Sequence, residues 1–445
     1  MMTILMRSFS VVVFGLTLIL LAPISANAAK ILEVRSPGGI TAWLVHEPTI
    51  PLLSVNFSFA GGASLDRPGR NGTANLVSGL LDEGAGSYDS LAFQTRLQDL
   101  AVRMSFSADR DSFSGGLSTL STNRDAAFEL LRLALIEPRF ETEAVERVRR
   151  QIITGLVESQ EDPGTIATRL WFATAFPDHP YGRPSNGSIE SVKAISTDDL
   201  RDLLGRMLAR NRLTIGVVGD ISAAELAPLL DKTFGALPVS VAIEPVPEVS
   251  PVGAGVLKVV QKANPQSQVM FGGPGLKRDD PDWYAAYVLN YVLGGGGFAS
   301  RLYAEVREKR GLAYSVYSYL YPLEHAAIYM GGVGTKNQRV AEALTVIKEQ
   351  IGLAGENGIT EAELVNAKTY LNGSFPLQLT SSGRIANLLL AIQRHNLGID
   401  YMDRRASLID AVTMADVRRV AKRLLRPENL LIVVVGEPAG LTSSN

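Results

Sequence analysis

The sequence has 445 residues, of which 46% are hydrophobic and 20% are charged, and its formal net charge is −2. This length allows two or more domains with cores of their own, and the composition is that of an ordinary globular protein. The small net charge gives no general attraction to nucleic acid or to an anionic membrane. The chain has no cysteine, which excludes disulfides, thiolate zinc ligands and a cysteine nucleophile.

Residues 1–28 are predicted to be a cleaved signal peptide. Arg7 supplies positive charge, residues 11–21 form a short apolar run, and Ala26-Asn27-Ala28 matches an A-x-A cleavage site. The apolar run is short for a membrane span, and an uncleaved anchor is the alternative. We therefore expect export to the periplasm, which suits a chain without cysteine, and a mature chain without a membrane span.

The first half of the mature chain is predicted to consist of strands followed by helices. Alternating apolar residues indicate strands over 40–45 and 53–59, the second ending at Gly61 and Gly62. Apolar residues at helical spacing predict helices that begin near Asn75 and over 91–104, 125–135, 143–158 and 165–175.

An internal repeat divides the chain into two halves. Ser196 corresponds to Thr413, and Gly219 to Gly436, at a constant offset of 217 residues. Each copy is predicted to be a helix capped by the hydroxyl residue, followed by a strand that ends in glycine and an acid. The proline-rich segment 238–255 is predicted to be a linker. We place the halves at 31–237 and 256–440, and expect an α+β fold with largely antiparallel sheets.

The most informative stretch begins with four glycines, Gly294, Gly295, Gly296 and Gly297. A helix is predicted over 302–310 and a strand over 312–320. Arg307 and Tyr314 lie on either side of the turn between them, and both can donate hydrogen bonds to a carbonyl oxygen that gains charge. The alternative is a solvated arginine on a helix and a half-buried strand tyrosine.

Residues 294–318 resemble the C-terminal signature of the pitrilysin/insulinase zinc peptidases, especially their bacterial, mitochondrial-processing-type branch. In that family a glycine-rich loop precedes S-R-L-x-x-x-x-R-x-x-x-G-L-A-Y-S. The resemblance implies two homologous α+β halves packed as a clam. It also implies that Arg307 and Tyr314 contact the substrate carbonyl at a zinc site, and that the loop 294–297 helps to bind an extended peptide.

The same family carries the zinc motif H-x-x-E-H in its first half. The resemblance places its two histidines at Asn75 and Gly79 and its glutamate at Ser78. The third ligand, a glutamate, falls at Gly155 or Leu156. None of these positions holds a histidine or a glutamate.

The residues themselves also argue against a zinc site in this chain. The four histidines are His46, His179, His325 and His395, and the closest two are 70 residues apart. No two histidines are therefore close enough in the sequence to form a local ligand pair. Zinc needs three or four nitrogen, sulfur or oxygen ligands, so the histidine spacing gives no sign of a zinc site. His179 lies in a segment that recurs in the family outside the metal site, and it is interpreted as part of a structural loop.

We therefore expect a non-catalytic, substrate-binding subunit of a heterodimeric periplasmic zinc metallopeptidase. A homologous H-x-x-E-H subunit would hold the zinc, this chain would bind no cofactor, and the substrate would be a peptide. The first alternative is a peptide-binding or structural module of the same fold with no peptidase role. The second is a self-sufficient hydrolase with unrelated chemistry, but no G-x-S-x-G elbow or phosphate loop is present.

Overall fold

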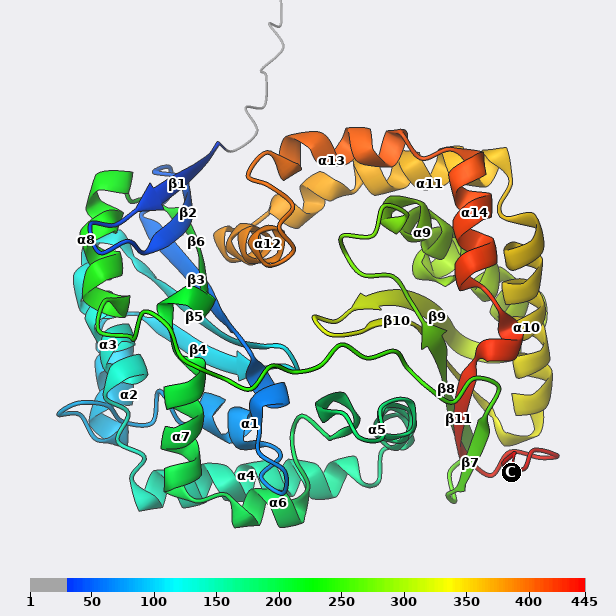
Figure 1. The fold of residues 1–445 in the computed structure, drawn as a ribbon, viewed down its shortest axis with the longest axis horizontal. Helices are drawn as coiled ribbons and strands as arrows, with labels where there is room; N and C mark the ends of the chain where they lie inside the picture. Colours follow the sequence, from blue (N-terminus) through cyan, green and yellow to red (C-terminus); the bar gives the residue numbers. More distant parts are fainter. Residues whose placement is uncertain (1–29, 445) are drawn as a thin grey trace, which may run out of the picture.

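The computed structural model describes residues 30–444, and the predicted signal peptide lies outside this range. The chain forms two halves, each built from one sheet and a set of helices, which face each other across the molecule (Figure 1). The predicted α+β class is confirmed. No helix between residues 30 and 444 is both long and apolar enough to cross a membrane.

The first half contains a six-stranded sheet with the order β1-β2-β6-β3-β5-β4. All neighbours are antiparallel except β2 and β6, which are parallel. Half-buried and exposed positions alternate in β4, whose half-buried Met104, Phe106 and Ala108 pack against the core. The strands are β1 Ile31–Arg35, β2 Thr41–His46, β3 Leu52–Ala60, β4 Arg103–Ala108, β5 Ser112–Leu120 and β6 Leu213–Gly219.

The helices of the first half mostly match the predicted ranges. They are α1 Thr73–Ser78, α2 Ser90–Asp99, α3 Arg124–Ile136, α4 Thr142–Ser159, α5 Pro163–Ala175, α6 Ile189–Ala194, α7 Thr197–Met207 and α8 Ala223–Phe234. The helix predicted over 91–104 is wrong at its end, because α2 stops at Asp99 and β4 begins at Arg103. Ala101 turns the chain with a positive φ of 51° between them.

The second half contains a five-stranded sheet with the order β7-β11-β8-β10-β9, so β9 is an edge strand. Its strands are β7 Leu257–Gln261, β8 Gln266–Pro274, β9 Ala313–Pro322, β10 Ala327–Lys336 and β11 Leu431–Gly436. Its helices are α9 Trp283–Asn290, α10 Val340–Asn357, α11 Glu361–Gly373, α12 Ser382–Arg394, α13 Tyr401–Asp410 and α14 Met414–Leu424.

The repeat in the sequence is visible in both halves. Ser196 caps α7 and accepts a hydrogen bond from the Asp199 amide (3.2 Å), and Thr413 caps α14 by the same bond from the Asp416 amide (3.2 Å). The strands β6 and β11 follow these helices. Local capping and strand patterns therefore behave as the sequence predicts.

One helix of each half packs on the sheet of the other half. Helix α5 packs on β8 and β11, and α12 packs on β3 and β6. The indole Nε1 of Trp171 in α5 donates a hydrogen bond to the carbonyl oxygen of Leu431 (3.1 Å). In the other direction, Gln393 Nε2 in α12 donates to the carbonyl oxygen of Ile215 (3.1 Å). This exchange joins the two halves through buried contacts.

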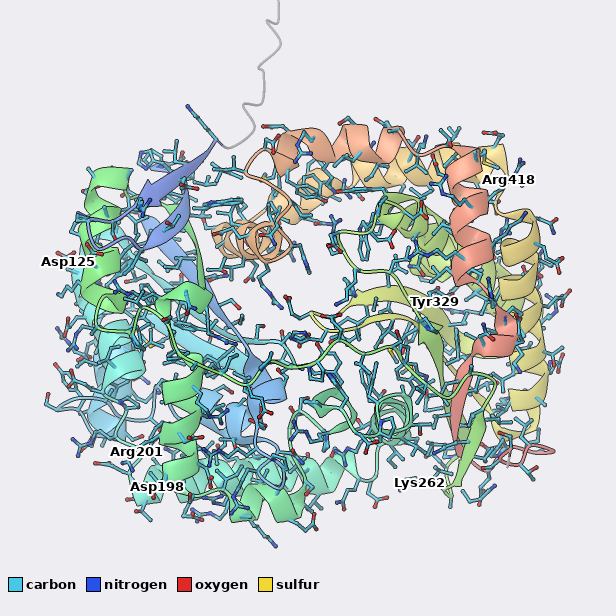
Figure 2. The ribbon with its side chains drawn as sticks, in the orientation of Figure 1. Asp125, Asp198, Arg201, Lys262, Tyr329 and Arg418 are labelled. Atoms are coloured by element: carbon cyan, nitrogen blue, oxygen red, sulfur yellow. The ribbon has the colours of Figure 1, made fainter. Side chains whose placement is uncertain are left out.

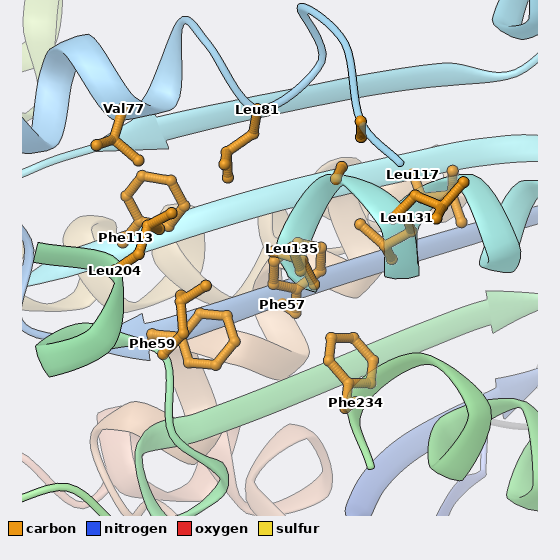
Figure 3. Packing of buried hydrophobic residues seen from close by; sticks show 14 of the residues in the cluster. Phe57, Phe59, Val77, Leu81, Phe113, Leu117, Leu131, Leu135, Leu204 and Phe234 are labelled. Carbon is orange, nitrogen blue, oxygen red and sulfur yellow. The ribbon is translucent and has the colours of Figure 1, made fainter. Parts of the chain in front are cut away.

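The core of the first half lies between its sheet and the outer helices (Figure 3). The Phe57 ring meets the Phe59 and Phe234 rings edge to face, at centroid separations of 6.0 and 5.6 Å. The charged residues labelled in Figure 2 lie toward the periphery, while Tyr329 is buried in the second half.

Candidate functional site

The glycine-rich loop is flanked by two π-helical segments. These are η5 (Tyr291–Gly295) and η7 (Tyr303–Glu308), with a short 3₁₀ turn, η6 (Gly297–Ala299), between them. The helix predicted over 302–310 is therefore present, but most of it has π rather than α geometry. π-helical segments are rare and occur frequently at functional sites. Segment η7 carries Arg307 at its exposed end.

Aromatic side chains hold the guanidinium of Arg307. Its Cζ atom lies 4.8 Å from the ring centroid of buried Tyr303 and 4.6 Å from that of Tyr314. The ring centroid of Phe298 lies 6.0 Å from the same Cζ atom. Such cation–π contacts attract the cation to the ring faces. The side chain of Arg307 is thus oriented without a carboxylate partner in the described part of the chain.

A β-bulge presents Tyr314 to solvent. Ala313 in β9 pairs with Thr335, and Ser315 pairs with Gly334, so Tyr314 is the extra residue between two consecutive pairs. Its side chain is 78% exposed. Bulges bend a strand and redirect one side chain, and they are common next to active sites. The strand predicted over 312–320 is confirmed, and the bulge explains why its tyrosine is not half-buried.

The four glycines have different roles in the structure. A Cβ on Gly294 would lie 2.3 Å from Ser318 Oγ, and one on Gly295 would lie 2.6 Å from Asn290 Nδ2. Ser318 and Asn290 are themselves joined, because Ser318 Oγ donates to Asn290 Oδ1 (2.8 Å). The first two glycines therefore let the loop pack against β9 and α9.

The remaining loop residues are more open. A Cβ on Gly296 would meet the Tyr291 carbonyl oxygen at 2.6 Å, but nothing lies within 4 Å of a Cβ on Gly297. Gly297 has a φ of 55° and is followed by Phe298, which is 75% exposed. Gly297 and Phe298 therefore form the more open end of the loop.

An ion pair fixes the start of η7. Arg301 Nε and Nη2 donate to the two carboxylate oxygens of Glu363 in α11, at 2.6 and 2.5 Å. Burial favours the neutral form of Glu363, but the Arg301 hydrogen bonds and the Thr360 amide outweigh it, and its pKa falls to about 2. The S-R-L part of the signature thus anchors the segment that carries Arg307.

The positions that the resemblance assigns to the zinc motif lie on α1 and its C-cap residue, and on α4. Ser78 Oγ donates to the carbonyl oxygen of Asn75 (2.8 Å), and a Cβ on Gly79 would lie 2.9 Å from Val148 Cγ1. Gly155 is exposed, with open space around its Cα, whereas Leu156 belongs to the core.

These side chains do not fit a zinc ion. An amide, a hydroxyl and two glycines offer none of the imidazole, thiolate or carboxylate ligands that zinc uses in proteins. Between residues 30 and 444, no group of three histidine, aspartate or glutamate side chains is arranged to hold a metal. His179 is buried in the loop before η3 (Pro180–Gly182), where Nε2 lies 3.0 Å from the Pro247 carbonyl oxygen and Nδ1 accepts from the Tyr181 amide.

Sequence reasoning missed a cavity of about 430 Å³ that borders β9. Ser315 and Tyr317 line it from β9, and α5 and the segment 182–186 line it from the first half. These segments are far apart in the sequence, and only the exchange of α5 brings them to β9. No local motif could have identified the cavity.

Two family descriptions match this chain. "Insulinase (Peptidase family M16)" matches residues 42–188, and "Peptidase M16 inactive domain" matches residues 194–371. A protein of Streptomyces coelicolor named "Uncharacterized zinc protease" is 27% identical over 407 residues, covering 89% of this chain and 88% of that protein. The "Non-peptidase homolog YmxG" of Helicobacter pylori is 29% identical over 331 residues, covering 74% and 76%.

A solved structure supports the same relationship. The crystal structure of a peptidase M16 inactive domain from Pseudomonas fluorescens matches with a TM-score of 0.86 and 26% identity, covering 93% of this chain and 99% of that one. The two homologous halves, the signature around Arg307 and Tyr314 and these similarities agree. The chain therefore belongs to the insulinase (M16) peptidase family, as a member without the H-x-x-E-H motif.

Proposed function

We propose that this chain is the non-catalytic, substrate-binding subunit of a heterodimeric zinc metallopeptidase. The observation that carries the proposal is the pairing of Arg307 with Tyr314, 4.6 Å from guanidinium to ring, on a chain whose zinc positions hold no suitable ligand. Because both donors are present but this chain has no zinc ligands at the expected positions, we infer that the donors act at a zinc site on another chain.

In the proposed complex, Arg307 and Tyr314 donate hydrogen bonds to the oxygen of the scissile carbonyl. That oxygen gains negative charge as water attacks, so donors already fixed in place stabilise the transition state more than the substrate. The partner carries H-x-x-E-H and would supply the zinc and the activated water. This chain contributes no metal ligand.

The edge strand β9 gives a way to hold the peptide. It pairs only with β10 in the described sheet, so its other edge can form main-chain hydrogen bonds with an extended chain. Tyr314 lies on this strand, which places a paired peptide next to the donors. The exposed end of the loop, Gly297 and Phe298, lies beside Arg307 and would contact the same peptide.

The location of the complex belongs to the proposal. The apolar run and the A-x-A site before residue 29 support export, and the periplasm is the compartment that we assign. A homologous H-x-x-E-H chain exported by the same cell is the expected partner.

A second candidate is a peptide-binding module without a peptidase role. It is favoured by the similarity to a Helicobacter pylori protein named a non-peptidase homolog. In this case β9 and the cavity beside it would hold peptides, and Arg307 would have no reacting oxygen to contact.

One reconstitution experiment separates these candidates. The mature protein is assayed for peptide cleavage and for zinc content, alone and mixed with the H-x-x-E-H chain of the same organism. A protein that is inactive and zinc-free alone but increases the activity of the mixture supports the subunit role. Cleavage by this chain alone would overturn it, and no effect of mixing, together with measurable peptide binding, would select the second candidate.

A further inference from the structure

The cavity beside β9 is basic. Its wall includes Arg110, Arg169 and Arg183, which come from the β4–β5 turn, from α5 and from the loop after η3. All three side chains are half-buried. None of them forms a salt bridge with any carboxylate of residues 30–444. Three arginines without a salt-bridge partner in one cavity give its wall an excess of positive charge.

Arg110 is the most constrained of the three. Its guanidinium lies over the Phe172 ring, with Cζ 3.7 Å from the centroid, and its Nε atom is buried without a hydrogen-bond partner among the described residues. A buried donor without a partner costs free energy unless a ligand or water satisfies it. Arg110 itself lines the cavity, so its guanidinium is fixed in the wall by the contact with Phe172.

Arg183 is held in place by the main chain. Its Nη1 donates to the carbonyl oxygen of Asp66 (3.0 Å), and burial lowers the pKa of its guanidinium. The nearby Asp66 carboxyl accepts the amides of Gly72 and Ala74, at 2.7 and 3.0 Å, and burial raises its pKa to about 7, so it only partly compensates the charge of Arg183.

One carboxylate also borders the cavity. It belongs to Asp162, the N-cap of α5, and Oδ1 accepts the amide of Thr165 at 2.6 Å. Hydrogen bonds from the Thr165 side chain and amide lower the pKa of Asp162, so it carries a negative charge that is held at the helix end. With three cations and this one anion, the wall remains net positive.

The cavity lies next to the strand that carries Tyr314. Ser315 and Tyr317 both line it, as alternate residues on one face of β9. Tyr317 is three positions from Tyr314, and a strand rises about 3.3 Å per residue, so the two lie roughly 10 Å apart. A peptide paired along β9 would place a side chain in the cavity a few residues from the bond opposite Tyr314.

We infer that this basic cavity binds the carboxylate of an aspartate or glutamate side chain of an extended peptide substrate. Arg169 and Arg110 donate to the carboxylate, and the edge of β9 holds the peptide main chain. The cavity thus selects peptides with an acidic residue at a fixed distance from the cleaved bond. The inference rests on the proposed function in taking a peptide as the ligand.

Peptide binding without the partner subunit tests this inference. Two short fluorescein-labelled peptides that differ only by glutamate or glutamine at one position are titrated with the full mature chain, and their fluorescence anisotropy gives the Kd. The position of the glutamate is moved along the peptide. At one position, glutamate should bind about tenfold more tightly than glutamine, because charge-assisted hydrogen bonds in a half-buried site contribute this much.

Variants of Arg169 test whether the preference arises in the cavity. The guanidinium of Arg169 forms no hydrogen bond or ion pair with another described residue, so a substitution removes no such contact within the protein. Arg169→Gln should reduce the preference for glutamate, because Arg110 remains as a donor, and Arg169→Glu should abolish it. Arg150→Gln is the matched control, since Arg150 is exposed on α4 and outside the cavity wall. It should keep the preference of the wild type.

The outcomes are distinct from those of the cleavage assay. Equal binding of the glutamate and glutamine peptides at every position, or a preference that Arg169→Gln leaves undiminished, overturns the inference. The inference is also overturned if inorganic phosphate binds in the cavity while both peptides bind equally, because the cavity would then be a site for free anions. Failure of Arg307 and Tyr314 to support cleavage would reject the proposed function and leave the charge preference in place.

Discussion

The guanidinium carbon of Arg307 lies 4.6 Å from the centre of the Tyr314 ring, although seven positions and a change from π-helix to strand separate them in the chain. Two local irregularities create this contact. The π-helical segment sets the direction of Arg307, and the bulge at Tyr314 adds one residue to β9 and turns its side chain out of the sheet. The two side chains lie against each other as a result.

Removing one donor of the pair should reduce activity in the reconstituted complex. We expect Tyr314→Phe or Arg307→Gln to lower kcat/KM for peptide cleavage by about 10²–10³-fold, because each removes a preorganised donor to the charged oxygen. Steady-state cleavage assays on the mixed subunits measure this effect. The melting temperature of the isolated chain should change little for Tyr314→Phe, since the side chain is 78% exposed.

The control for this prediction is Tyr370→Phe. Tyr370 is also exposed and stacks on Tyr291 at a centroid distance of 5.1 Å, but it does not contact Arg307. It should leave cleavage unchanged. Full activity of the Tyr314→Phe complex would remove the basis of the proposed function.

Two alanine substitutions in the glycine-rich loop should have different consequences. Gly294→Ala would force a Cβ to within 2.3 Å of Ser318 Oγ and 2.7 Å of the Ser318 amide nitrogen, so β9 or the loop must move. We expect it to destabilise the chain by about 1–3 kcal/mol, as overpacking does. It should also reduce complex activity, because β9 carries Tyr314.

Gly297→Ala serves as the comparison. Its Cβ would meet nothing within 4 Å, so the cost is limited to a side chain at φ 55°, about 1 kcal/mol. Urea denaturation of both variants measures the difference. A larger loss for Gly297→Ala than for Gly294→Ala would contradict the assignment of Gly294 as a packing position.

Gly155 should be replaceable with a gain in stability. It lies inside α4, is exposed, and has open space where a Cβ would stand. Glycine inside a helix costs about 0.5–1 kcal/mol relative to alanine. We therefore expect Gly155→Ala to raise the free energy of unfolding by about that amount, as measured by thermal or urea denaturation.

The same change at Gly79 provides the contrast. A Cβ there would lie 2.9 Å from Val148 Cγ1, so Gly79→Ala should give no comparable gain. If Gly155→Ala instead destabilises the chain, then this position has a role that its packing does not reveal.

The Arg301–Glu363 ion pair should make stability depend on pH in the acidic range. The pKa of Glu363 is about 2 in the folded chain, against an ordinary value of 4.5. A lowered pKa means that the pair stabilises the fold above pH 4.5, and that this contribution is lost as the pH falls from 4.5 toward 2. The difference in unfolding free energy between wild type and Glu363→Gln should therefore be largest near neutral pH and shrink through this window.

Urea denaturation of both proteins at a series of pH values measures this difference. Glu342→Gln is the control, because Glu342 pairs with Arg339 on an exposed surface (2.8 Å), where ion pairs contribute little. A difference for Glu363→Gln that stays constant across the window would show that the charge of this carboxylate does not stabilise the anchor.

The elements that the sequence predicts best are those with strong local signals. The caps at Ser196 and Thr413 accept hydrogen bonds from amides three residues further on, so they depend on local chemistry alone. The alternation over 53–59 likewise reflects the two-residue period of a strand. The helix predicted over 91–104 failed at its end because apolar Val102 and Met104 fit either period. Packing of Phe106 and its neighbours on the core selected a strand.

For the candidate site, the sequence by itself supplied Arg307 and Tyr314 and the absence of histidine and glutamate at the positions that the resemblance assigns to the zinc motif (Asn75, Ser78, Gly79 and Gly155 or Leu156), since these depend only on which side chains are present. The tertiary structure alone decided how they are arranged. The bulge depends on the pairing of β9 with β10, and the basic cavity depends on α5 packing on the sheet of the other half. Contacts between distant segments are set by burial across the whole chain, which no local pattern of residues encodes.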